Sequence, residues 1–326
     1  MAVTPFPVPD DVVTVLPAGR TVYGIQLPIQ SQSTIYAQAW EADAGPDELA
    51  TIAQACEAAG FFYVGVCDHT FIPERLAGAM STVWYDTIAT LGYLAGVTSS
   101  IRLLSHIYVL ALRHPLRAAK EFATVDVLSG GRVICGVGAG HVNEEFDQMG
   151  PEFEHRGTAT DEAMVALALG LVHEFPNLTG PRWEASGLGL KPRPVQLPRP
   201  PIWTGGSSPA ALRRTARYAD GWLPQSLGPN TELLAQLRRF RDEYREGAPL
   251  DIGGLTEFLW VGDAPAGFDL PAGTRVGTPD ELAGYLRTFK EAGVGQIQVR
   301  FPSRSADELC DQITRFGAEV APLVDD

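Results

Sequence analysis

Short apolar segments alternate with amphipathic helical segments along most of the chain, and this alternation limits the possible folds more than any other feature. Eight segments are short and rich in apolar and β-branched residues, which is typical of buried strands. They span residues 23–27, 61–67, 101–109, 132–138, 201–205, 221–224, 255–262 and 296–301. The repeated order of strand and helix predicts parallel strands joined by crossover helices.

Helical sequence follows each predicted strand, and the helix boundaries have recognisable signals. Pro46 and Pro115 stand where a first helical turn begins, and Thr278 can cap the helix that Pro279 enters. We predict helices over 46–59, 82–97, 115–128, 158–175, 210–218, 230–245, 278–292 and 305–321. We predict polar loops over 29–45, 70–81 and 141–157.

Eight such units in 326 residues predict a closed α/β fold, the (β/α)₈ or TIM barrel, with insertions. We expect a single domain over residues 1–326. The segment 176–200 is rich in proline and glycine, so we interpret it as an excursion outside the regular repeat. An open, doubly wound sheet is the alternative, but it usually has a glycine fingerprint after its first strand, and residues 23–28 have none.

Glycines recur at every second position where the predicted fourth strand ends. Gly136, Gly138 and Gly140 leave the backbone bare, so a bulky group can lie against it. A strand that ends in glycines and polar residues is typical of a site at the strand C-termini of an α/β fold. The polar residues after the glycines are His141, Asn143, Glu144 and Glu145. The alternative to a functional site is that this stretch is a helix–strand packing contact followed by a solvated acidic turn.

Composition excludes several classes of function. The formal charge of −14 argues against a nucleic acid or an acidic membrane surface as partner. The first residues, MAVTPFPVPDD, do not resemble a signal peptide, and no apolar stretch is long enough to predict a membrane span. The six histidines lack metal-ligand spacing, so no metal site is expected. Scattered cysteines without a C-x-x-C pair predict reduced, buried thiols and a cytoplasmic protein; they are Cys56, Cys67, Cys135 and Cys310.

In a barrel, the residues that end the strands meet around one mouth, where active sites lie. Here those residues combine glycines with groups that bind protons and anions. They are Gln26, Asp68, His69, Ser105, His106, Ile107, the run from Gly138 to Glu145, the run from Gly205 to Ser208, Pro224, Gln225 and Arg300.

Two long phrases and a short one between them resemble the bacterial luciferase-like family of flavin and deazaflavin barrels. They are RHPLRAAKEFATVDVLSGGRVICGVGAG at 113–140, EEFDQMG at 144–150 and RPPIWTGGSSPAALRRTARYADGWLP at 199–224. The pair Asp68-His69 resembles the branch that uses the 8-hydroxy-5-deazaflavin coenzyme F-420 in place of FMN. The resemblance implies hydride transfer between C5 of that coenzyme and a small organic substrate, and a possible homodimer.

The resemblance also implies a non-prolyl cis peptide in a bulge of the third strand, beside the coenzyme ring. In this chain the bond falls at His106-Ile107, although relatives more often have a small residue at the first position. Sugar-phosphate-oxidising relatives have a glutamate where His141 stands, so that substrate is not carried over.

Each candidate residue has a role that its chemistry suits. A serine-rich loop at a helix start can bind a phosphate, which both F-420 and FMN contain; its residues are Gly205, Gly206, Ser207 and Ser208. We expect the ring to lie against Gly138, Ala139 and Gly140, close to Ser105, His106 and Ile107. Asp68 can orient His69 or bind the coenzyme tail, and Arg300 can meet an anionic tail or form a salt bridge.

Two histidines are candidates for proton transfer, because histidine titrates near neutral pH. His69 is the first, and His141 with Glu144 or Glu145 is the second. A substrate pocket is predicted from Gln26 and three aromatic residues, for which core packing is the alternative; these are Phe71, Trp84 and Tyr85.

Three functions remain open. The preferred one is a deazaflavin-dependent oxidoreductase. The second is an FMN-dependent monooxygenase supplied with reduced flavin by a separate reductase. The third is a non-catalytic protein that binds the coenzyme on the same scaffold.

Overall fold

The computed structural model describes residues 11–325, and within them the predicted strands form a closed, parallel barrel of eight strands. The third strand of the barrel is interrupted and has two parts. In chain order the strands are β1 (Val22–Gln26), β2 (Tyr63–Val66), β3 (Arg102–Ser105) with β4 (Tyr108–Val109), β5 (Val133–Gly138), β8 (Ile202–Gly205), β9 (Gly221–Leu223), β10 (Asp251–Val261) and β12 (Gln296–Arg300).

The last strand closes the barrel against the first. Gln296 of β12 lies opposite both Val22 of β1 and Gly253 of β10, and all the barrel pairings are parallel. Because β1 and β12 are paired, the sheet has no free edge there. The prediction of a (β/α)₈ barrel is confirmed, and the open, doubly wound alternative is wrong.

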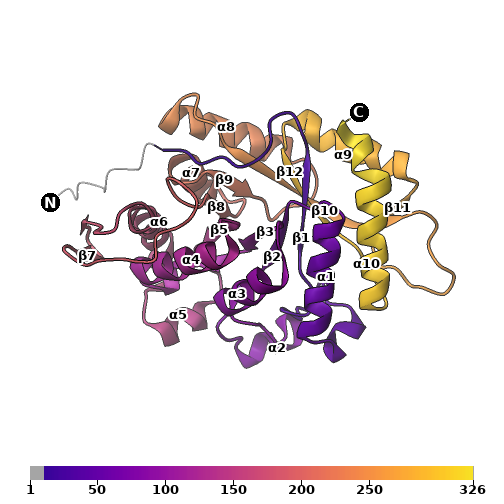
Figure 1. Ribbon diagram of the computed structural model, residues 1–326, viewed down its shortest axis with the longest axis horizontal. Helices are drawn as coiled ribbons and strands as arrows, with labels where there is room; N and C mark the ends of the chain where they lie inside the picture. The colour runs from indigo at the N-terminus through magenta and orange to yellow at the C-terminus, as the bar shows by residue number, and fades with distance from the viewer. Residues whose placement is uncertain (1–10, 326) are drawn as a thin grey trace.

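Helices surround the strands in chain order, and the indigo α1 lies beside the yellow α10 where the ring closes (Figure 1). Each of these helices follows one barrel strand. They are α1 (Pro46–Ala58), α3 (Thr87–Val97), α4 (Pro115–Ser129), α6 (Arg156–Val172), α7 (Pro209–Tyr218), α8 (Thr231–Arg245), α9 (Pro279–Ala292) and α10 (Ala306–Arg315), which continues through η4 (Phe316–Val320) into α11 (Pro322–Asp325).

The capping signals place the helix ends as the sequence predicts. Thr278 and Glu281 form a reciprocal capping box at the start of α9, with Pro279 in the first turn. Gly130 ends α4 in the left-handed conformation, with φ of 70°. The helix predicted from residue 82 instead begins at Thr87, because the Asp86 carboxylate accepts a hydrogen bond from the Ala89 N–H and caps it there.

The loop predictions are wrong in part. Residues 29–45 contain η1 (Ala39–Asp43), residues 70–81 contain α2 (Glu74–Met80), and residues 141–157 contain α5 (Asn143–Met149) and η3 (Phe153–His155). The excursion at 176–200 contains a small antiparallel hairpin outside the barrel. Two further short elements accompany the barrel strands: η2 (Leu110–Leu112), which follows β4, and a short strand that pairs in parallel with β10. These strands are β6 (Leu178–Thr179) and β7 (Glu184–Ala185) in the hairpin, and β11 (Arg275–Gly277) beside β10.

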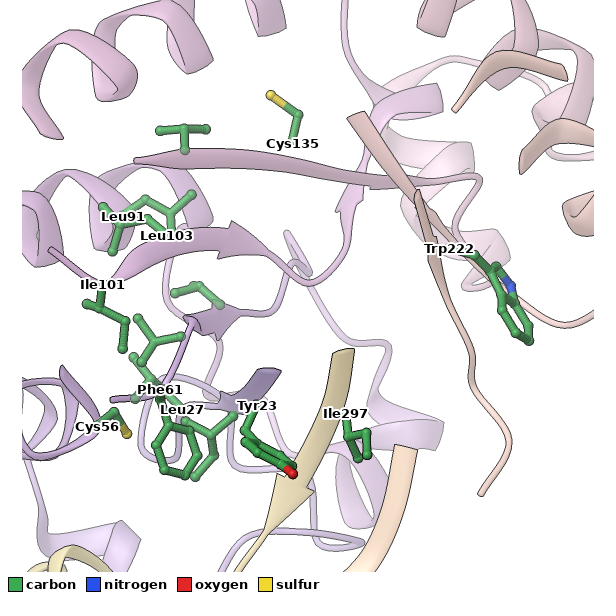
Figure 2. Packing of buried hydrophobic residues seen from close by; sticks show 14 of the residues in the cluster. Tyr23, Leu27, Cys56, Phe61, Leu91, Ile101, Leu103, Cys135, Trp222 and Ile297 are labelled. Atoms are coloured by element: carbon green, nitrogen blue, oxygen red, sulfur yellow. The ribbon is translucent and has the colours of Figure 1, made fainter. Parts of the chain in front are cut away.

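The main core lies between the strands and the surrounding helices. Figure 2 shows Leu103, Tyr23 and Ile297 on barrel strands, with Leu91 of α3 and Cys56 of α1 among the buried residues that pack on the strands. A second cluster of buried residues contains Tyr63 and Trp203, whose rings pack edge to face with their centroids 6.1 Å apart. Of the four free cysteines, three are buried as predicted, and Cys310 is only half-buried.

The lead-in segment covers the N-terminal end of the barrel. The N–H groups of Val13 and Val15 donate to the carboxylates of Asp220 and Asp251, which stand at the starts of β9 and β10. Asp220 also forms a buried ion pair with Arg199. The segment from residue 11 to β1 therefore closes this end of the barrel, while residues 1–10 lie outside the described part. No helix of residues 11–325 is long and apolar enough to cross a membrane.

Asp251 gives a pH-dependent contribution to stability. Burial raises its pKa from 3.8 to about 6, so the folded protein holds this proton more tightly than the unfolded chain. Its stabilising contribution is complete below pH ~4 and is lost as the pH rises to ~6. A shift of this size corresponds to about 3 kcal/mol.

We therefore expect the unfolding free energy of Asp251→Asn, relative to that of the parent, to rise by about 3 kcal/mol as the pH increases from 4 to 7. Urea unfolding of both proteins across this range measures the difference. Parallel profiles would contradict the prediction.

Candidate functional site

A cavity of about 740 Å³ opens at the C-terminal ends of the barrel strands. Most residues that the sequence places around one mouth do line it. From the predicted set these are Gln26, Asp68, His69, Trp84, His106, Ile107, Gly138, Ala139, Gly140, His141, Gly205, Gly206, Ser208, Pro224, Gln225 and Arg300. This size and position suit a small organic ligand.

His106 and Ile107 separate β3 from β4 at the cavity wall, and the peptide bond that joins them is cis, as the family resemblance implies. Nδ1 of His106 is buried and has no hydrogen-bond partner among residues 11–325. Burial, and secondarily the charge of Arg300, lowers the pKa of His106 to about 4. The cavity wall therefore contains a neutral imidazole with a free polar atom.

Gly136 lies behind this wall, where β5 passes close to β3. A Cβ at Gly136 would lie 1.9 Å from the carbonyl oxygen of Ser105. Ser105 itself is buried, does not line the cavity and donates a 2.8 Å hydrogen bond to the Gly136 carbonyl. The added Cβ is attached directly to the backbone and the Ser105 oxygen belongs to the backbone. Relief of this clash therefore requires a shift of the backbone, which costs free energy.

Gly136→Ala is expected to lower the free energy of unfolding by about 2–3 kcal/mol. Gly138→Ala is the matched control on the same strand. Its Cβ would meet only the Ile107 side chain, at 3.3 Å, so we expect a loss of about 1 kcal/mol or less. Urea unfolding measures both, and equal losses would contradict the argument.

The carboxylate of Asp68 is bound by residues of β4 and of the segments that flank the third strand. Its carboxylate accepts hydrogen bonds from the Val109 N–H at 2.7 Å, from the Thr87 hydroxyl at 3.0 Å, and from both terminal nitrogens of Arg113, at 2.5 and 2.8 Å. Arg113 also lies over the Tyr108 ring at 4.3 Å. Asp68 therefore anchors β4 rather than orienting His69. Arg113 is a residue that the sequence analysis missed, although it stands in the quoted phrase at 113–140.

His69 is paired with Glu145 instead. Nδ1 of His69 lies 2.8 Å from a Glu145 carboxylate oxygen, and the other oxygen accepts a 2.7 Å hydrogen bond from the Thr70 N–H. Glu145 is buried; burial raises its pKa, but the His69 contact and the backbone N–H donors outweigh burial, and the net direction is down. An ionised Glu145 fixes His69 by Nδ1 and leaves Nε2 for the cavity.

His141 and Glu144 lie on either side of this pair. His141 meets His69 edge to face at 5.2 Å and is exposed on part of its surface; the burial of the rest, and secondarily the charge of His69, lowers its pKa. Glu144 turns to the other side of α5, where it binds Arg75 at 2.6 and 2.9 Å. The structure therefore brings Glu145, and not Glu144, to the histidines.

The loop that the sequence predicts to bind a phosphate joins β8 to α7. Gly206 has φ of +114°, which opens the loop at the start of α7. The Ser208 hydroxyl accepts from the Ala211 N–H at 3.2 Å and lines the cavity. Ser207 does not line it; its hydroxyl accepts from the Gln225 N–H at 3.2 Å.

Two arginines beside this loop were also missed. Arg156, the first residue of α6, donates to the Gly140 carbonyl at 3.3 Å and lies over the Phe153 ring at 3.8 Å. Arg214 is paired with Asp161 at 2.5 Å. Both line the cavity. The sequence does contain a signal for Arg156. It is a basic residue at the start of the helix after the glycine strand, where the helix dipole disfavours a positive charge.

The aromatic residues divide between the cavity and the surrounding structure. Trp84 lines the cavity and packs edge to face on His69, with ring centroids 4.5 Å apart. Phe71 is exposed and Tyr85 packs against the core, and neither lines the cavity. Arg300 lies over the Tyr36 ring, 4.0 Å from its centroid.

Comparisons with known proteins agree with this architecture. An uncharacterized protein of Mycobacterium tuberculosis is 27% identical over 288 residues, which cover 84% of this chain and 94% of that protein. Two solved structures share the fold at low identity. The coenzyme F420-dependent tetrahydromethanopterin reductase of Methanopyrus kandleri has a TM-score of 0.72 and 21% identity and covers 93% of this chain and 99% of its own. The structure of a riboflavin lyase with modified FMN and riboflavin has a TM-score of 0.75 and 15% identity. The match covers 94% of this chain and 91% of the lyase chain.

The sequence identities to these proteins are too low to assign a family, but a family model does so. The model of the luciferase-like monooxygenases matches residues 21–266, from the start of β1 to beyond the end of β10. The matched part contains every cavity residue described above except Arg300. The chain belongs to the luciferase-like monooxygenase family, whose members are oxidoreductases and monooxygenases.

Proposed function

We propose that this protein is a deazaflavin-dependent oxidoreductase that transfers a hydride between C5 of coenzyme F-420 and a small organic substrate. The observation that carries the proposal is the His69–Glu145 pair at the wall of a cavity of about 740 Å³. A buried carboxylate that fixes one imidazole nitrogen leaves the other to exchange a proton with a ligand.

The residues around the cavity fit such a coenzyme. A Cβ at Gly205 would lie 1.6 Å from the Ile107 side chain, so the wall depends on bare backbone at this point. The unpartnered Nδ1 of His106 offers a polar contact to a ring in the cavity. Gly206, Ser208 and the start of α7 suit the phosphodiester, and Arg156 adds a positive charge on the same side.

When bound, the deazaflavin ring supplies a hydride donor or acceptor at C5. The chain's part is to hold the substrate and move a proton. Nε2 of His69 is the atom placed for proton exchange, because Nδ1 is engaged by Glu145. Trp84 packs on the His69 ring and fixes its orientation. Both side chains of the pair are largely buried, which strengthens their contact.

An FMN-dependent monooxygenase that receives reduced flavin from a separate reductase is the second candidate. The loop of Gly205, Gly206 and Ser208 favours it as much as the first, because FMN also ends in a phosphate. The riboflavin lyase, whose structure contains modified FMN, shares the fold. The two candidates differ in the ring that the cavity prefers and in the use of oxygen.

Fluorescence titration of the purified protein with oxidised and reduced F-420 and with FMN tests the proposal. We expect micromolar or tighter binding of F-420 and far weaker binding of FMN. A preference for FMN would assign the oxygen-using function, and binding of neither would overturn both. Tight binding of F-420 without turnover across a broad substrate screen would favour a non-catalytic coenzyme-binding protein.

A further inference from the structure

Arg300 differs from the other arginines near the cavity because its guanidinium has neither a carboxylate nor a carbonyl partner among residues 11–325. Arg113 and Arg214 are paired with carboxylates, and Arg156 donates to the carbonyls of Gly140 and Phe153. The guanidinium of Arg300 takes part in no ion pair or hydrogen bond among residues 11–325, and it lies over the face of Tyr36. A half-buried guanidinium with free N–H donors is a strong binding site for a carboxylate, whose oxygens accept those hydrogen bonds.

Arg300 also lies on the far side of the barrel from the phosphate-binding groups. It ends β12, whereas Gly206 and Ser208 follow β8 and Arg156 follows β5. In the closed order β1-β2-β3-β5-β8-β9-β10-β12, β12 lies three strand-to-strand steps from β8 and four from β5. A coenzyme whose phosphate lies by α7 therefore has a second anion-binding group across the cavity from that phosphate.

The surroundings of Arg300 suit an organic anion with an apolar body. Arg300 lines both the main cavity and a smaller one of about 60 Å³, whose walls include Trp40, Phe258 and Leu309. Glu41 also lines the smaller cavity, but its carboxylate accepts hydrogen bonds from the N–H groups of Ile29 and Gln38, at 2.8 and 2.7 Å. The carboxylate of Glu41 is thus satisfied by backbone and does not neutralise Arg300.

We propose that Arg300 binds the anionic group of the substrate, and that the substrate class is small organic carboxylates with an apolar body. This inference rests on the proposed function and deepens it, because it replaces an unspecified organic substrate with a chemical class. It also assigns Arg300 to the substrate rather than to the coenzyme tail. The reacting carbon then lies on the cavity side of Arg300, and the apolar part extends along Tyr36 and the smaller cavity.

Matched pairs of ligands test the assignment by isothermal titration. The probes are benzoate against benzamide and hexanoate against hexanamide, which differ in charge but hardly in shape. We expect the parent to bind each carboxylate about tenfold or more tighter than its amide, as for a charge-assisted hydrogen bond. In Arg300→Gln the preference should fall to about twofold or less, and Arg300→Lys should restore part of it.

Two control variants locate the effect. Arg304→Gln removes a surface arginine that is paired with Glu308, four residues after Arg300, and should leave the carboxylate preference unchanged. Arg156→Gln removes a cation from the opposite wall and should also leave it unchanged. Loss of the preference in Arg156→Gln, its persistence in Arg300→Gln, or its absence in the parent would each overturn the inference.

The coenzyme titration separates this inference from the proposed function. If Arg300→Gln binds F-420 as the parent does and loses only the carboxylate preference, both proposals are supported. If Arg300→Gln loses F-420 binding and keeps the carboxylate preference, Arg300 serves the coenzyme tail and the inference is overturned, while the proposed function stands. Melting temperatures of the variants confirm that each protein is folded.

Discussion

Replacing His69 with glutamine is expected to lower kcat by about 10²- to 10⁴-fold, the usual contribution of a general acid or base. Glutamine keeps a side chain of similar length and can still contact Glu145, but it cannot exchange a proton. The affinity for F-420 should change little, because the groups proposed to hold the coenzyme come from other strands. Absorbance of the coenzyme during turnover measures kcat, and fluorescence titration measures affinity.

Controls separate proton transfer from general damage to the site. His155→Gln removes an exposed histidine outside this cavity and should leave kcat unchanged. His141→Gln removes the neighbouring ring, which is exposed and forms no hydrogen bond or ion pair with Glu145 among the described residues, and should cost far less than His69→Gln. If His141→Gln caused the larger loss, the role of proton donor would pass from His69 to His141.

Glu145 illustrates why a pattern of residue types does not fix a site. Glu144 and Glu145 are adjacent, and the sequence offers no reason to prefer one for the histidines. Their side chains separate only because residues 143–149 are helical, which directs consecutive side chains to different faces. No side chain caps α5, and the buried contacts of Glu145 and Phe146 hold it in place. A helix that depends on tertiary contacts is not predictable from local sequence.

The barrel itself was predictable for the opposite reason. Its strands are apolar and most of its crossover helices carry their own caps, so most units are specified by nearby residues. The errors concern elements without such signals, such as α2, α5 and β11. The partners of charged groups were equally hidden, because Asp68 and Arg113 stand 45 residues apart in the chain. Sequence spacing identifies which charges are present but not which are already neutralised.

The pair of Asp68 and Arg113 leads to the second large expectation, a loss of about 3–5 kcal/mol in unfolding free energy for Arg113→Met. Methionine keeps much of the apolar stem but removes the guanidinium. The Asp68 carboxylate, whose side chain is 2% exposed, then remains buried with only the Val109 N–H and the Thr87 hydroxyl as donors. An uncompensated buried charge is far more costly than the loss of a surface contact.

Arg117→Met is the matched control, four residues further along the chain in the first turn of α4. Arg117 is paired with Glu121 across one helical turn and its side chain is 73% exposed, so we expect a loss of about 0.5 kcal/mol or less. The double variant Asp68→Asn with Arg113→Met should be more stable than Arg113→Met alone, because it also removes the stranded charge. Urea unfolding compares the variants at one pH.

The same variant tests whether the pair shapes the cavity. Asp68 holds the N–H of Val109, two residues beyond the His106–Ile107 wall, so loss of its counterion should loosen that wall as well as the fold. We therefore expect Arg113→Met to weaken F-420 binding about tenfold even where the protein is fully folded, while Arg117→Met leaves the affinity unchanged. A loss of stability with unchanged affinity would mean that the pair supports the barrel alone. Equal losses of stability in the two arginine variants would mean that solvent already compensates Asp68.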